Sequence, residues 1–269
     1  MSARAPARRY PWRTFAFLAA AGTLTAPLAI PYTLALEANV RAAAPPPNAF
    51  GVLAMMARAL VLMTPAAGLG LLVARRLGLG APYLESWLDG APRPAEPLRS
   101  IAGPALRWAA VAALAAFGVD AFFVRALGVR VPAPEIHARI DVVWWRGALA
   151  SLWAPFAEET FDRLLLLSLV AWIGTSLFRA RGSRGRTVAL WCAILLTATF
   201  FGWYHIGNER IFAQVVPPIV ALRTVLIILP VGLAFGWLYV RRGLEAAILS
   251  HFLIDLIVHV LRPLAGRLG

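Results

Sequence analysis

Charged residues are scarce in this chain: they make up 14% of its 269 residues, while 60% are hydrophobic and the mean hydropathy is +0.72. Soluble domains carry about 25% charged residues, so this chain has too little polar surface to cover a water-soluble globule. The high apolar content also excludes an intrinsically disordered chain, whose composition is poor in hydrophobic residues. The composition therefore indicates an integral membrane protein.

Lysine is absent, so all 26 basic residues are arginines, and with 13 acidic residues they give a net charge of +13. Most arginines fall in short segments between apolar runs, a pattern that orients a protein in a membrane rather than building a face for nucleic acid. We therefore expect a lipid bilayer as partner and no nucleic acid. The single cysteine, Cys192, excludes an intramolecular disulfide and a thiolate metal cluster.

Seven apolar runs are long enough to cross the hydrocarbon core, which needs about 20 largely apolar residues. They predict an all-α, polytopic transmembrane helix bundle of about seven spans (six to eight), at Thr14–Leu36, Phe50–Ala74, Pro104–Gly128, Trp153–Phe178, Thr187–Ile206, Val215–Val240 and Leu244–Leu264. The first run is longer than the hydrophobic region of a cleaved signal peptide, so we interpret it as an uncleaved helix. The segment Asp141–Leu152 is either an amphipathic lead-in or an extension of the fourth span, with Pro155 at the break.

The distribution of arginines predicts the orientation of the chain. With the N-terminus in the cytoplasm, the cytoplasmic segments hold fourteen arginines and the opposite segments hold six, as the positive-inside rule requires. The composition, rich in alanine and arginine and free of lysine, favours a GC-rich bacterial genome, so we expect the bacterial inner (cytoplasmic) membrane. We divide the chain into N-terminal helices and loops, 1–140, and a core with polar motifs, 141–269.

The fourth predicted span carries the acidic and basic cluster Glu158-Glu159-Thr160-Phe161-Asp162-Arg163. Ionisable side chains at membrane depth are unfavourable unless they are paired or hydrated, so each is a functional candidate. Glu159 and Arg163 are four residues apart on one helix face and can pair, which leaves Glu158 for proton transfer. The alternative is a charge cluster at the membrane surface that only caps the helix.

Two further polar motifs lie on later spans. Phe201 and His205 are four residues apart on the fifth span, and His251, Asp255 and His259 form an i, i+4, i+8 stripe on the last. The structural alternative for His205 is a histidine at the membrane interface, and for the stripe on the last span it is a ladder of hydrogen bonds between helices. Together the motifs place carboxylates and imidazoles on three helices, which is sufficient for acid–base hydrolysis inside a membrane.

The motifs Glu-Glu-x-x-x-Arg, Phe-x-x-x-His and His-x-x-x-Asp occur in this order on successive apolar segments. This order resembles the CPBP family of intramembrane proteases, also called the Abi or CAAX-protease family, which includes type II CAAX prenyl endopeptidases and bacteriocin-immunity proteins. The resemblance covers about Trp153–Leu264, under half of the chain. It implies an intramembrane endopeptidase that hydrolyses a peptide bond in a membrane-associated protein or peptide.

The resemblance also implies a role for each motif residue. Glu158 would be the general base that activates water, assisted by His205. His251 and Asp255 would stabilise the oxyanion or position the substrate carbonyl. The supporting residues would be Glu159, Arg163, Phe201 and His259.

This interpretation requires no cofactor, but Asp255 leaves a zinc ion open. Several members of the family carry asparagine here, and an ionised aspartate accepts hydrogen bonds but cannot donate one to an oxyanion. Asp255 would therefore be protonated, orient His251, or bind a cation. If a metal is present, His205, His251 and Glu158 would supply the three ligands of a catalytic zinc site.

The same buried polar residues are compatible with two functions other than proteolysis. A bacteriocin-immunity or proton-coupled transport protein would use them without catalysis, and a scaffold would use them only to hold helices together.

The depth of the motif residues in the membrane is a separate question, because Glu158 and His205 are expected nearer the extracytoplasmic ends of their spans and His251 near mid-helix. Arg58 and Arg223 also lie inside spans, where they would pair across helices or contact an anionic substrate group.

Overall fold

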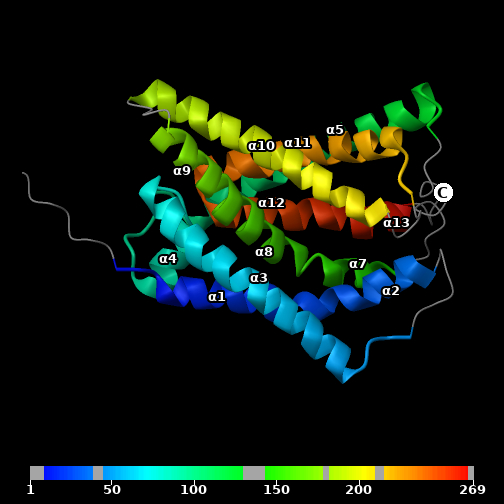
Figure 1. The fold of residues 1–269 in the computed structure, drawn as a ribbon, viewed down its shortest axis with the longest axis horizontal. Helices are drawn as coiled ribbons and strands as arrows, with labels where there is room; N and C mark the ends of the chain where they lie inside the picture. The colour runs from blue at the N-terminus through cyan, green and yellow to red at the C-terminus, as the bar shows by residue number, and fades with distance from the viewer. Residues whose placement is uncertain (1–8, 39–44, 130–142, 178–181, 210–214, 266–269) are drawn as a thin grey trace, which may run out of the picture.

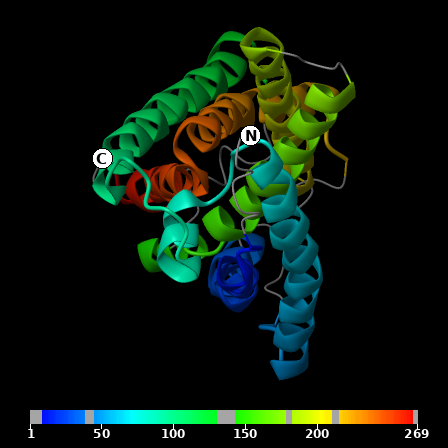
Figure 2. The same cartoon turned by 90° about the vertical axis from the view of Figure 1, so that its left-hand side faces the viewer.

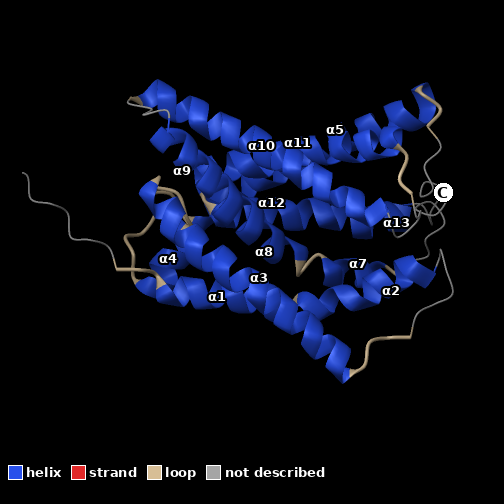
Figure 3. Cartoon of the chain, in the orientation of Figure 1, coloured by secondary structure: helices blue, strands red, loops and turns tan. Residues whose placement is uncertain are grey.

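The computed structural model describes residues 9–38, 45–129, 143–177, 182–209 and 215–265, and every regular element within these ranges is helical (Figure 3). Seven helical segments within the same ranges are long and apolar enough to cross a membrane, so the all-α fold and the predicted number of spans are confirmed. Their bounds are Trp12–Ala38, Ala49–Arg76, Leu98–Ala126, Trp144–Leu177, Ser183–Glu209, Pro218–Arg242 and Leu244–Ala265.

Several spans are built from more than one helical element. In chain order the elements are α1 (Trp12–Leu24), η1 (Ala26–Ala29), α2 (Ile30–Ala38), α3 (Ala49–Arg76), α4 (Pro82–Asp89), η2 (Leu98–Ile101), α5 (Ala102–Ala121), η3 (Phe122–Ala126), α7 (Trp144–Ala150), α8 (Ala154–Glu159), η4 (Thr160–Leu167), α9 (Ser168–Leu177), α10 (Ser183–Glu209), α11 (Pro218–Arg242), α12 (Leu244–Leu256), η5 (Ile257–Leu261) and α13 (Arg262–Ala265). The elements η3, η4 and η5 are π-helical. Because π-helical turns are frequent at functional sites, these three segments are of particular interest.

The fourth span begins earlier than the sequence indicated. Helix α7 extends it to Trp144, and the chain breaks between Ala150 and Ala154, directly before Pro155. The described part of the segment 141–152 is therefore an extension of the span, while residues 141–142 lie outside the described residues. With this extension Glu158 lies near the middle of the span rather than near its extracytoplasmic end, whereas His205 remains within the last turns of α10.

The helices form one bundle in which α10 packs along α11, α5 packs against α11 and α12, and α1 crosses α3 (Figure 1). The N-terminal half of α3 extends away from the other helices (Figure 2), and its side chains at Phe50, Leu53 and Val61 are exposed. Apolar exposure of this kind is what a lipid-facing helix requires, because its surroundings are hydrocarbon.

Small residues allow α10 and α11 to approach closely. A Cβ atom on Gly232 would lie 2.9 Å from the Cα atom of Ala198, and one on Gly202 would lie 2.8 Å from the carbonyl oxygen of Val225. Transmembrane helices associate through such contacts, since lipid supplies no hydrophobic force between them. The close packing fixes the helix that carries His205 against the helix that carries Phe235.

Parts of the predicted topology lie outside the described residues. These parts include the arginines 4, 8, 41, 130, 139, 179, 181, 210 and 267 that contributed to the orientation, and the predicted end of the fourth span at residue 178. Among the described arginines, one group lies where α3 and α11 end and α10 begins. We call it the arginine-rich end, and its members are Arg75, Arg76, Arg184, Arg186, Arg241 and Arg242.

Candidate active site

Arg163 is the central cation of the polar cluster. It lies one helical turn after Glu159, with 3.2 Å between its Nη1 atom and Glu159 Oε1, and both side chains are buried, with 1% and 0% exposed. Its Nη2 atom donates to the carbonyl oxygen of Gly232 at 3.3 Å, and its guanidinium lies 4.5 Å from the centroid of the Phe201 ring. The predicted Glu159–Arg163 pair is therefore present, and Phe201 packs against it.

Glu159 joins the first motif to the third. Its Oε1 atom lies 2.7 Å from Nδ1 of His251, a residue 92 positions away in the chain. The ring of Phe235 stacks on the imidazole, with centroids 4.8 Å apart and planes 20° apart. An imidazole whose Nδ1–H donates to an ionised carboxylate has its orientation fixed, and its Nε2 atom faces the other way.

Two carboxylates lie on the Nε2 side of His251. Asp255 Oδ1 is 3.6 Å from Nε2 and Glu158 Oε2 is 3.9 Å from it. Glu158 is the more accessible of the two, with 23% of its side chain exposed against 14% for Asp255. The cluster thus combines a fully buried glutamate that orients the imidazole with a partly exposed glutamate on the opposite side.

His205 lies next to Phe201 on α10. Its Nδ1 atom is 2.7 Å from the carbonyl oxygen of Phe201, so Nδ1 carries the hydrogen, and a neutral imidazole then keeps a lone pair on Nε2. The two rings meet edge to face at 4.6 Å, as expected from their spacing of four. Within the described residues, His205 has no hydrogen bond or ion pair with Glu158 or Glu159, and His251 is the imidazole closer to Glu158.

The stripe on the last span is also present. Nε2 of His259 is 3.9 Å from Asp255 Oδ1, and its Nδ1 atom is 2.8 Å from the hydroxyl of Tyr32. The backbone of His259 packs against Gly147 of α7, where a Cβ atom would collide with the carbonyl group. His259 thereby ties the end of the site to the first and fourth spans.

Sequence reasoning missed the pair formed by Asp162 and Tyr204. Asp162 is fully buried, and its Oδ2 atom accepts a hydrogen bond of 3.0 Å from the hydroxyl of Tyr204. The signal available in the sequence was a third carboxylate four residues after Glu158. Its partner was not identifiable, because Tyr204 lies 42 residues further along the chain and no motif includes it. Phe235 was missed as well, since an aromatic residue in an apolar run has no distinguishing pattern.

A zinc site built from His205, His251 and Glu158 does not match the arrangement of the side chains. Among the described residues, no group of three or more His, Cys, Asp or Glu side chains is placed to hold a metal ion. Asp255 and Glu158 approach the same nitrogen of His251, while His205 has no polar contact with Glu158 among the described residues. We therefore derive no step through a metal.

A second arginine cluster lies away from the motifs. Arg223 donates from Nε to Oδ1 of Asp120 at 2.9 Å, and its Nη1 atom is 3.7 Å from Oε1 of Glu209. The expected pairing of Arg223 across helices is therefore present, and Asp120 pairs with it rather than with Arg125. Arg58 is exposed on α3 and has no polar partner among the described residues.

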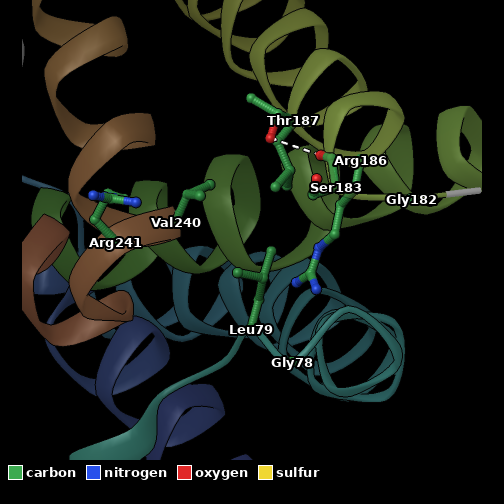
Figure 4. Close-up of a pocket in the computed structure, with 9 residues that line it drawn as sticks. Gly78, Leu79, Gly182, Ser183, Arg186, Thr187, Val240 and Arg241 are labelled. Carbon is green, nitrogen blue, oxygen red and sulfur yellow. Dashed lines mark hydrogen bonds between the residues drawn. The ribbon is translucent and has the colours of Figure 1, made fainter. Parts of the chain in front are cut away.

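A pocket of about 510 Å³ opens at the arginine-rich end (Figure 4). Arg186 and Arg241 lie on either side of Leu79 in it, and Arg186 donates to the carbonyl oxygen of Leu77. None of the motif residues lines this pocket. The polar cluster and the pocket are therefore separate features.

Comparison with known proteins gives one match. No curated protein and no solved structure matches the chain. The family model described as type II CAAX prenyl endopeptidase Rce1-like matches residues 140–257. The matched region contains all three motifs, from Glu158 to Asp255, and ends just before His259. The match covers under half of the chain, and it supports the similarity of residues 140–257 to CAAX-type proteases in general.

Proposed function

We propose that the chain is an intramembrane endopeptidase in which Glu158 is the general base. The observation that carries this proposal is the position of Glu158, partly exposed and 3.9 Å from an imidazole whose other nitrogen is fixed by a buried glutamate. A general base must meet water, and Glu158 is the most exposed carboxylate of the cluster, since Glu159 and Asp162 are fully buried. The resemblance of the motifs to the CPBP family supports the same assignment.

The proposed step is the hydrolysis of one peptide bond. Glu158 takes a proton from a water molecule, whose oxygen attacks the carbonyl carbon of the substrate and forms a tetrahedral oxyanion. When the C–N bond breaks, the proton held by Glu158 passes to the departing amine. The products are a carboxylic acid and an amine, so no oxidant, reductant or cofactor is consumed.

The two histidines have different roles in this proposal. His251 is held by Glu159, and its Nε2 atom, together with Asp255, is directed to the water or the substrate carbonyl. His205 keeps Nε2 available, because its Nδ1 is bound to the carbonyl oxygen of Phe201, and we propose that Nε2 assists the water or the carbonyl. Hydrogen bonds aimed at an oxyanion in a water-poor site are the largest contribution in many acyl-transfer enzymes.

The substrate we propose is a membrane-associated protein or peptide. With Glu158 near midspan as the base, we propose that the scissile bond enters the bilayer. The exposed apolar helices support a membrane location. We propose the bacterial inner membrane with the N-terminus in the cytoplasm, on the basis of the arginine distribution. A lipid-anchored or sorted surface protein, or a bacteriocin-like peptide, fits this setting better than a prenylated protein.

The test compares the wild type with Glu158→Gln, purified in detergent, for cleavage of a fluorogenic library of membrane peptides. Glu96→Gln is the matched control, because Glu96 is an exposed carboxylate paired with Arg242 outside the polar cluster. Each protein is assayed with and without a chelator. We expect chelator-resistant cleavage by the wild type and Glu96→Gln, and a loss of about 10³-fold in Glu158→Gln.

Three outcomes would overturn the proposal. Cleavage that survives in Glu158→Gln would remove Glu158 as the base. Cleavage that is lost with chelator and restored by zinc would assign ligand roles to the histidines and carboxylates. If the folded wild type cleaves neither the library nor its co-purified membrane proteins, the transport or immunity function would replace the protease.

A further inference from the structure

The motifs alone do not explain how His205 is held in a fixed position relative to Glu158. Within the described residues, His205 makes no polar contact with the glutamates of α8, and its own hydrogen bond goes to Phe201 on the same helix. A residue that assists Glu158 must nevertheless be held in a fixed relation to it, because a displacement of about 1 Å can lower a rate a hundredfold.

Asp162 and Tyr204 bridge the two segments. Asp162 lies four residues after Glu158 in the π-helical segment η4, and Tyr204 directly precedes His205 on α10. The hydroxyl of Tyr204 donates to Asp162 Oδ2 at 3.0 Å, and the same oxygen is 3.8 Å from Nη1 of Arg163. One hydrogen bond thus connects the segment that carries the proposed base to the helix that carries His205.

The phenol ring also contacts the imidazole. Tyr204 stacks on His205 with ring centroids 4.8 Å apart and planes 28° apart, and it meets the edge of Phe201 at 5.4 Å. Phe201 meets His205 edge to face from another direction. Two aromatic rings and one carbonyl oxygen therefore restrain the imidazole, and of these only Tyr204 also bonds to η4.

The arrangement is poorly suited to stability alone. The Oδ1 atom of Asp162 is buried and has no hydrogen-bond partner among the described residues. An unsatisfied buried oxygen is unfavourable, and apolar residues of the same shape often replace a buried polar pair without loss of stability. A bridge that only joined two helices would not need the carboxylate.

We propose that Asp162 and Tyr204 are positioning residues that hold the His205 imidazole in register with Glu158. Asp162 fixes the phenol, and the phenol fixes the imidazole by stacking, so the geometry of η4 is transmitted to α10. This inference rests on the proposed function, because it assigns His205 a part in the reaction.

The first test replaces Tyr204 by phenylalanine, which keeps the ring and removes only the hydroxyl. Tyr239→Phe is the matched control, since Tyr239 is a buried tyrosine whose hydroxyl lies 2.7 Å from Ser168 Oγ and, among the described residues, bonds to no motif side chain. We expect Tyr204→Phe to lower kcat about tenfold with KM within about twofold, and Tyr239→Phe to keep kcat within about twofold. Equal kcat values in the two variants would overturn the proposal.

The second test asks whether Tyr204 acts through His205. The Tyr204→Phe change is made in the wild type and in His205→Gln, and both pairs are compared for kcat. We expect no further loss in the His205→Gln background, since the group being positioned is gone. Losses that multiply would show a structural role and contradict the proposal. Failure of the proposed function is distinguishable from failure of this inference. If the proposed function is wrong, either Glu158→Gln still cleaves the peptide or the wild type does not cleave it.

Discussion

Arg163 and Arg223 each lie between two carboxylates, yet the two clusters differ in what surrounds the ions. Arg163 is 1% exposed, lies near the middle of its span and is enclosed by aromatic rings. Arg223 is 10% exposed and lies close to the beginning of α11, where its partner Glu209 is the last residue of α10. Both clusters adjoin a π-helical segment, so a π-helical turn does not distinguish them.

The difference lies in the other titratable groups that surround each arginine and its paired carboxylates. Around Arg163, Glu159 also binds His251, and Glu158 and Asp255 lie on the far side of that imidazole. Around Arg223, within the described residues, no imidazole contacts either carboxylate. Ion pairing at membrane depth is therefore insufficient to identify a site. A surplus of titratable groups with partial access to water is what makes the Arg163 cluster the candidate active site.

The largest expected contrast between the clusters concerns activity. Glu159→Gln removes the charge that orients His251, so we expect kcat to fall by about 10²- to 10³-fold. Asp120→Asn weakens the Arg223 cluster and should leave kcat within about threefold, because nothing in that cluster reaches the motifs. Single-turnover cleavage of one peptide by the two variants measures both effects. Equal losses would erase the distinction between the clusters.

The next contrast concerns stability. Arg163→Met leaves Glu159 and Asp162 buried without their cation, and we expect a loss of about 3 kcal/mol in the free energy of unfolding. The measurement is denaturant unfolding in detergent micelles. A loss below about 1 kcal/mol would mean that both carboxylates are already neutral or hydrated, so that the ion pair contributes little.

Arg223→Met should have a smaller effect on stability. Its carboxylate partners are 14% and 24% exposed and lie near span ends, where water can solvate them, so we expect a loss of about 1–2 kcal/mol. Its kcat should stay at the wild-type value. A loss of activity at unchanged stability would instead favour the other interpretation of Arg223, contact with an anionic substrate group.

Asp89 gives the smallest expected effect and lies outside both clusters. Its carboxylate accepts backbone N–H bonds from Arg13 at 3.0 Å and Thr14 at 2.9 Å, and so caps the beginning of α1. Desolvation by burial raises the pKa of Asp89, but hydrogen bonds from the Thr14 hydroxyl and from both backbone amides outweigh it and hold the pKa below its ordinary value. We expect Asp89→Asn to lower the free energy of unfolding by about 1 kcal/mol.

The pH dependence of this cap has a definite sign. Because the folded pKa lies below the unfolded value of about 4, the stabilisation by Asp89 is complete above that value and is lost as pH falls through the folded pKa. Wild type and Asp89→Asn should therefore converge in stability on acidification and differ most near neutral pH. A difference that grows on acidification would contradict the role of the carboxylate as a cap.

The sequence was sufficient for features that depend on local spacing. The number of spans follows from apolar runs, and the Glu159–Arg163 pair and the His251–Asp255–His259 stripe follow from the helical period. The sequence left the segment 141–152 open between an amphipathic lead-in and an extension of the fourth span, and its described part is the extension. Pro155 did mark the break in that span.

The contacts that join distant segments were beyond the sequence. His251 and Glu159 are 92 residues apart, and Arg223 and Asp120 are 103 residues apart. The unfavourable burial of a charge predicts that a partner exists, but the choice among several carboxylates depends on how the helices cross. For the same reason the proximity of His251, rather than His205, to Glu158 emerged only from the packing of α12 against α8.

The most direct test of the central claim, that Glu158 acts as the base in one catalytic unit with His251, is the cleavage rate of the double variant Glu158→Gln/His251→Gln. The two single variants and the wild type are measured in the same single-turnover assay. Residues that act as a unit give losses that do not multiply, so we expect the double variant to be about as slow as the slower single variant. A double variant whose loss equals the product of the two single losses would show that the two residues act independently and would contradict the account.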